Sequence, residues 1–231
     1  MIVLPLAALI AVASASVPAA AISPACPDVV TSEAFVCRAL EASQAGKAEA
    51  AAAAFEQAAL ATDDKDPAKA RMLAAAGNMW IAAGQPGKAA LALDRALAGT
   101  ALQAEQRGEA LLDRARVAEA QNDLETARAR LNEAAATISA DPFYWYFSAA
   151  LAIRELDKAT AQSAINRALS LAPNDPTVLF EAGHVAHFVG DQGKARAYWT
   201  QAEAADRAGP IGKAAKEALA LLPSPATGTK P

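Results

Sequence analysis

The chain has 231 residues, a formal net charge of −4 and 54% hydrophobic residues, of which alanine supplies a large share, but only 5% aromatic residues. Alanine is the strongest helix former, and the β-branched and aromatic residues that strands favour are scarce, so the composition predicts an all-α protein. The acidic balance, with no run of lysine or arginine, argues against the basic surface with which proteins bind nucleic acid.

The amino-terminal segment carries no charge before Asp28. Its apolar run from Ile2 to Val12 is followed by small residues that end at Ala21. An apolar core followed by an A-x-A-like site is typical of a secretory signal peptide. We therefore predict a signal peptide over residues 1–21, an N-terminal extension over residues 22–31, and a periplasmic or secreted protein.

A retained membrane anchor is the alternative interpretation of this segment. Pro5 and Pro18 interrupt the apolar stretch, which leaves fewer than the roughly 20 apolar residues that a spanning helix needs. Cleavage is the preferred prediction, and no integral membrane segment is then expected in the mature chain.

The two cysteines, Cys26 and Cys37, are the only ones in the sequence. An even number of cysteines in an exported chain favours a disulfide, which here would tie the extension to the first helix. A metal site is disfavoured because no histidine or third cysteine lies nearby in the sequence.

A small–large–small pattern recurs five times along the chain, with spacings of four and three residues that place its members on one helical stripe. The first occurrences start 38 residues apart and the later ones 34 residues apart. The five occurrences are Ala51, Phe55 and Ala58; Ala89, Leu93 and Ala96; Ala127, Leu131 and Ala134; Ala161, Ile165 and Ala168; and Ala195, Trp199 and Ala202.

A second helical segment precedes each stripe and ends at a turn. The turns contain Gly46, Gly84, Asn122 and Gly190, residues that tolerate a left-handed backbone. The remaining turn, around Leu156, contains no glycine. Each repeat is therefore predicted to be a helix–turn–helix unit.

This pattern resembles the tetratricopeptide repeat family, whose unit of about 34 residues has a small–large–small stripe on its second helix. Arg38 and Arg114 depart from the pattern, because the family usually has apolar residues there, and the first two units carry four extra residues each, near Thr62–Pro67 and Gly99–Ala104. The residues that follow the pattern best are Gly77, Trp80, Gly84, Ala89, Leu93 and Ala96, and Pro173, Gly183, Gly190, Ala195, Trp199 and Ala202.

The resemblance covers residues 32–207 and implies an all-α, right-handed α-solenoid of about five repeats. The expected units are residues 32–69, 70–107, 108–141, 142–175 and 176–207. Residues 208–222 are predicted to form a capping helix, because the last apolar face would otherwise meet water. Residues 223–231 are rich in proline and threonine and are predicted to be a disordered tail.

The family resemblance also implies a concave groove, lined by the leading helices, that holds a peptide or protein partner. Aromatic residues gather on the expected wall of the last two units, and exposed apolar clusters often mark partner sites. Trp145, in the same aromatic run, is expected in the core. The predicted partner-binding residues are Phe143, Tyr146, Phe147, Phe180, His184, His187, Phe188, Arg71, Asn78 and Arg116.

The preferred function is accordingly a non-enzymatic scaffold that uses no cofactor. One alternative is a self-associating module whose aromatic patch forms a homodimer interface. A remote alternative is a metal-dependent enzyme at His184 and His187, although zinc sites need three or four ligands. Some members of the family grip a terminal carboxylate with a lysine, asparagine and arginine set, but no lysine occupies the corresponding positions here.

Overall fold

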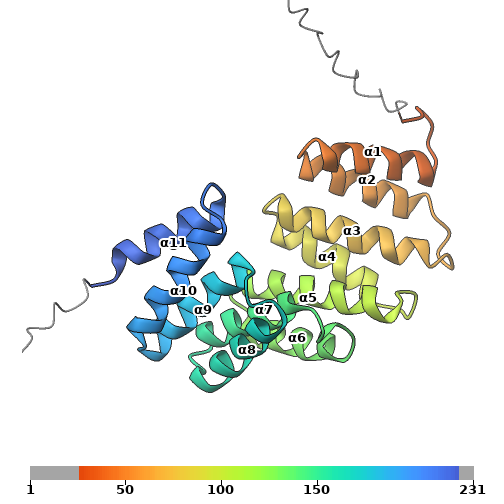
Figure 1. Cartoon of the computed structure of the whole chain (residues 1–231). Coiled ribbons are helices and arrows are strands. Elements are labelled where there is room, and N and C mark those ends of the chain that lie inside the picture. Colours follow the sequence, from red (N-terminus) through yellow and green to blue (C-terminus); the bar gives the residue numbers. More distant parts are fainter. Residues whose placement is uncertain (1–25, 224–231) are drawn as a thin grey trace, which may run out of the picture.

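The computed structural model describes residues 26–223, and the predicted signal peptide and all of the predicted tail except Pro223 lie outside that range. Within it the chain forms eleven α-helices that follow one another along a curved path (Figure 1). The first six are α1 (Ser32–Gln44), α2 (Ala48–Leu60), α3 (Ala68–Ala82), α4 (Pro86–Leu97), α5 (Ala104–Ala120) and α6 (Leu124–Ile138). The others are α7 (Pro142–Arg154), α8 (Lys158–Leu171), α9 (Pro176–Val189), α10 (Gln192–Ala205) and α11 (Pro210–Leu221).

The helices pack as five sequential pairs, with α11 against the last pair. All fifteen residues of the small–large–small stripes are buried. Their alanines bring helix axes close together, and this closeness explains the glycines on the leading helices. A Cβ on Gly77 would lie 2.5 Å from Cγ of Leu93, and one on Gly183 would overlap the indole of Trp199.

Each pair turns through one residue in the left-handed region. These residues are Gly46, Gly84, Asn122, Leu156 and Gly190. The amide of the following residue then donates to a carbonyl near the end of the leading helix, as Asp157 N does to Ala152 O at 2.9 Å. The five predicted turns are thus confirmed, and the fourth uses a leucine with φ of 61°.

The extra residues of the first two units lie in the connections between pairs. Residues 61–67 join α2 to α3 and residues 98–103 join α4 to α5, whereas residues 139–141 suffice between α6 and α7. Leu102 of the second connection is buried, with 6% of its surface exposed. The inserted loop therefore contributes to the packing beside α5.

The interior consists of four apolar clusters arranged along the curve. Single side chains belong to the edges of two clusters at once: Leu97 joins the first and second, and Trp145 joins the second and third. Leu169 and Tyr198 both join the third and fourth. Trp145 is thus half-buried at a boundary between clusters, and its indole N–H donates to Ser139 O at 2.7 Å.

The two arginines that interrupt the repeat pattern, Arg38 and Arg114, donate hydrogen bonds to other segments of the chain. Arg38 donates to the carbonyls of Pro27 and Val29, at 3.2 and 3.0 Å. Arg114 of α5 donates to Asp94 of α4 at 2.8 Å and so links the second unit to the third. A guanidinium replaces the usual apolar contact at both positions.

The two ends of the described chain differ. At the start, Cys26 and Cys37 form a disulfide with their Cα atoms 5.7 Å apart, which fixes the extension against α1. At the end, α11 buries Gly212 and Ala215 while Lys213, Lys216 and Glu217 are exposed, as predicted for a capping helix. None of the helices between residues 26 and 223 combines the length and hydropathy of a membrane-spanning segment.

Candidate functional site

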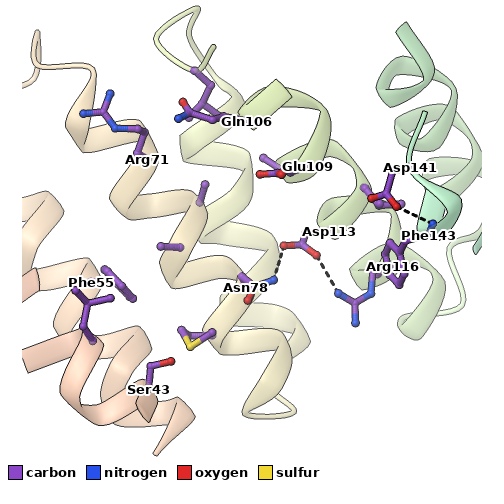
Figure 2. A pocket seen from close by; sticks show the side chains of 17 residues that line it. Ser43, Phe55, Arg71, Asn78, Gln106, Glu109, Asp113, Arg116, Asp141 and Phe143 are labelled. Carbon is purple, nitrogen blue, oxygen red and sulfur yellow. Dashed lines mark hydrogen bonds and ion pairs between the residues drawn. The ribbon is translucent and has the colours of Figure 1, made fainter. Parts of the chain in front are cut away.

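A groove of about 640 Å³ lies on the face formed by the leading helices α1, α3 and α5, and it ends at the start of α7 (Figure 2). Its floor is apolar and is built from Leu40, Phe55, Ala74, Ala75, Met79, Leu102, Ala110, Leu112 and Phe143. Its polar side chains come from Ser43, Arg71, Asn78, Gln106, Glu109, Asp113, Arg116 and Asp141.

The helix phase of α3 and α5 sets this lining. Arg71, Ala74, Ala75 and Asn78 recur at helical spacing on α3 and line the groove, and Asn78 reaches Asp113 of α5 (Figure 2). The small alanines leave the floor open, because a large side chain at either position would fill it. The predicted residues Arg71, Asn78 and Arg116 therefore all line one cavity.

A chain of polar and aromatic contacts crosses from α3 to α7. Asn78 Nδ2 donates to Asp113 Oδ2 at 2.8 Å, and Arg116 Nη1 donates to Asp113 Oδ1 at 2.9 Å (Figure 2). The guanidinium of Arg116 lies 5.5 Å from the ring centroid of Phe143. Phe143 in turn contacts Tyr146 edge to face, with centroids 4.7 Å apart. These contacts hold the groove's far wall in one arrangement.

Tyr146 is half-buried beside this wall. Burial raises the pKa of its phenol, while the charge of Arg116 acts in the opposite direction. The phenol is therefore neutral at physiological pH and presents a hydroxyl that both donates and accepts hydrogen bonds.

Phe147 does not face the groove, contrary to the prediction. Only 8% of its surface is exposed, and it packs with Tyr144 in the cluster between the third and fourth units. Successive helical residues project about 100° apart, so Tyr146 and Phe147 cannot share a face, whereas Tyr144 and Phe147 can. Phe147 therefore belongs to the core rather than to a partner surface.

The predicted aromatic residues of α9 have other neighbours. The ring of His184 lies 4.4 Å from that of Phe180 and 5.5 Å from that of Trp199, and His187 lies 5.9 Å from Trp199. Phe188 instead packs against the third cluster, with the ammonium of Lys158 5.6 Å from its ring. Within residues 26–223 no ring contact joins these residues to Phe143 and Tyr146.

The two histidines face different partners. His184 Nδ1 lies 3.4 Å from Glu181 Oε2, and His187 Nδ1 lies 3.0 Å from Gln192 Oε1. In the described part of the chain no three histidine, cysteine or acidic side chains come together as metal ligands would. The arrangement gives no support to the metal-enzyme alternative.

A second hollow of about 420 Å³ adjoins the groove at the first unit and shares Leu40 with it. It is lined by Cys26, Glu33, Val36, Cys37, Leu40, Glu41 and Gln44. The disulfide thus forms part of its wall. The extension lies at the first-unit end, away from Phe143 at the other end.

Of the residues that line the groove, only Arg71, Asn78, Arg116 and Phe143 had been predicted from the sequence to bind a partner; Leu102, Gln106 and Asp141 are among those that had not. Leu102 comes from the inserted connection and Gln106 from the first turn of α5. The four extra residues of the second unit are therefore the sequence feature that could have indicated that this connection reaches the groove. Asp141 caps α7 by accepting from Phe143 N at 2.8 Å, which places its carboxylate at the groove's end.

No protein-family model and no curated protein sequence matches the chain. Solved structures do match. MamA is 19% identical with a TM-score of 0.60, covering 83% of this chain and 98% of its own. YrrB, described as a tetratricopeptide repeat protein with an unusual peptide-binding site, is 17% identical with a TM-score of 0.56, covering 80% and 91%. PilW, a type IV pilus biogenesis factor, is 18% identical with a TM-score of 0.67, covering 81% and 83%.

At these identities the likeness concerns the fold. The chain is an all-α solenoid of the tetratricopeptide repeat type, with helices packed in sequential pairs.

Proposed function

We propose that this protein is an exported, non-enzymatic scaffold that holds a peptide segment of a partner in the groove between α1 and α7. The observation that carries the proposal is the groove itself, which combines an apolar floor with a polar rim. Binding sites have this composition because apolar contact supplies affinity and a few polar groups fix the ligand's orientation.

The shape of the groove favours an extended or helical peptide over a small molecule. Its walls are parallel helices from consecutive units, and it continues into the hollow beside Cys37. A peptide running along it would contact Leu40 and Met79 on the floor and end against Phe143. Aromatic and arginine side chains are the residue types that contribute most at interfaces, and Phe143 and Arg116 lie together at that end.

Two features support export. The disulfide between Cys26 and Cys37 persists only in an oxidising compartment. The uncharged segment that precedes Cys26 has the composition of a signal peptide. Together they support the proposed periplasmic or secreted location.

The proposal is tested by blocking the groove. A displayed peptide library is selected on the full chain, and the selected peptides are titrated by fluorescence anisotropy. Ala74→Trp places an indole on the floor and should weaken binding at least about tenfold, or about 1.4 kcal/mol. The control is Ala53→Trp, at an exposed position of α2 outside the lining, which should leave affinity unchanged.

Equal binding by both tryptophan variants, or a selection that yields no peptide, would contradict the groove assignment. Light scattering on the same protein tests the alternative in which the half-buried Phe143 and Tyr146 form a homodimer interface. A mass that does not change with concentration and equals that of one chain excludes it.

A further inference from the structure

The charges around the groove are not balanced. Its lining holds three acidic residues, Glu109, Asp113 and Asp141, and two basic ones, Arg71 and Arg116. The adjoining hollow adds two more acids, Glu33 and Glu41, and no base. The whole chain has only four more acidic than basic residues, so these two neighbouring cavities hold most of that excess.

Hydrogen bonds already satisfy part of this set. Asp113 accepts from Asn78 and Arg116, and Asp141 accepts from the amide of Phe143. Glu109, in contrast, makes no hydrogen bond or ion pair with any residue between 26 and 223, and the guanidinium of Arg71 on α3 points away from it (Figure 2). Glu109 is therefore available to a ligand.

The same holds in the hollow at the first unit. Glu33 and Glu41 are exposed, and neither forms an ion pair within the described part of the chain. Leu40, which borders both cavities, exposes 51% of its surface. Three unpaired carboxylates thus line the two cavities that meet at this uncovered leucine, and Arg71 is the one unpaired guanidinium in the described lining of the two cavities.

We infer that the partner segment is a basic peptide in which lysine or arginine alternates with apolar side chains. The inference rests on the proposed function, because it presumes that the groove binds a peptide. Apolar side chains would cover Leu40 and the alanine floor, and cations would meet Glu33, Glu41 and Glu109. A cleft of one sign of charge focuses its field and accelerates the approach of an oppositely charged ligand.

The strength of the effect follows from exposure. Exposed ion pairs contribute little each, and charge complementarity acts on specificity and association rate more than on affinity. Removing the charge of a single glutamate is thus expected to change the affinity for a basic peptide severalfold, and removing the charges of Glu33, Glu41 and Glu109 together is expected to change it more.

The experiment uses three fluorescein-labelled peptides of about twelve residues with identical apolar residues, in which the remaining positions are all lysine, all glutamine or all glutamate. Each is titrated against the full chain by anisotropy at about 50 and 300 mM NaCl. The lysine peptide should bind about tenfold more tightly than the glutamate peptide at low salt, and the difference should shrink at high salt.

Variants locate the effect. The combined change Glu33→Gln, Glu41→Gln and Glu109→Gln should weaken the lysine peptide about tenfold and leave the glutamine peptide unchanged. Glu217→Gln, on the exposed face of α11, should change neither.

Other outcomes separate the two proposals. If the three peptides bind equally, or if the glutamate peptide binds most tightly, the charge inference is overturned while peptide binding in the groove stands. If none binds and selection also yields no ligand, the proposed function fails with it.

Discussion

At the scale of single residues, the fold depends on a few positions where a side chain would not ordinarily be accepted. Gly77 and Gly183 admit the large stripe residues of their partner helices. Five turn residues adopt a positive φ, and three of them are glycine. Of these five turn residues, Leu156 is expected to destabilise the fold most, because a left-handed backbone conformation costs a residue with a side chain roughly 1–2 kcal/mol.

Replacing this leucine with glycine should stabilise the protein. Leu156 exposes 77% of its surface, so Leu156→Gly removes the backbone strain with little loss of buried apolar area. The expected gain in the free energy of unfolding is about 0.5–1 kcal/mol, less than the full strain because glycine is more flexible when unfolded. Urea unfolding followed by circular dichroism measures it.

Leu91→Gly is the matched control. Leu91 is also exposed, at 69%, but it lies inside α4, where glycine should cost about 1 kcal/mol. A loss of stability at both positions would show that the turn carries no strain.

At the scale of the helix, α6 to α10 all have the same kind of N-cap residue. Each begins after an aspartate whose carboxylate accepts from backbone amides of the first turn: Asp123, Asp141, Asp157, Asp175 and Asp191. Hydrogen bonds from the hydroxyl and amide of Thr126 lower the pKa of Asp123, those from Thr160 lower the pKa of Asp157, and the amide of Lys194 lowers the pKa of Asp191.

These caps make stability depend on pH. A carboxyl whose pKa is lower in the folded state contributes stability that is present above its unfolded pKa, near 3.8, and is lost as pH falls through the folded value. Asparagine caps helices as well as aspartate does but does not titrate there. The variant Asp123→Asn, Asp157→Asn and Asp191→Asn should therefore lose less thermal stability than the parent between about pH 5 and pH 2.

The control for this series replaces three exposed glutamates that accept no hydrogen bond in the described structure, Glu105, Glu125 and Glu217, with glutamine. It removes the same number of charges without touching a cap. If both triple variants change acid sensitivity equally, net charge and not capping is responsible.

The sequence predicted helices better than it predicted contacts between units. The stripe spacing fixes which residues pack inside a pair, so all five stripes are buried as expected. The groove depends instead on how one pair sits on the next. That geometry placed Leu102 in the lining through an inserted loop, which no periodic pattern encodes. The burial of Phe147, in contrast, agrees with helical spacing, which puts it on the same face as Tyr144 and not on that of Tyr146.

At the scale of the whole molecule, each unit touches only its neighbours, and stability is therefore a sum of local terms. Within residues 26–223 the first unit has one neighbouring unit, which it meets at α3, and no helix caps it as α11 caps the other end. The disulfide and the hydrogen bonds of Arg38 compensate by fixing the extension against α1.

Removing the disulfide should destabilise this end alone. Closing a loop between residues 26 and 37 is worth about 2–3 kcal/mol in the chain-entropy model. With Cys26→Ser and Cys37→Ser, amide exchange in α1 and α2 should accelerate about 30-fold or more, whereas amides of α9 should keep their protection, because α9 shares no cluster with α1. Equal acceleration in both regions would show that the solenoid unfolds as one unit.

The side chains shared between clusters have a mechanical consequence. Leu97 and Trp145 each join two apolar clusters at their edges, so we expect bending of the solenoid to occur at these boundaries rather than inside a cluster. A rotation of a few degrees at one boundary displaces the far end of the solenoid by an amount that grows with the distance between that boundary and the end. We therefore expect such bending to change the separation of the two ends of the described chain more than it changes the packing inside any helix pair.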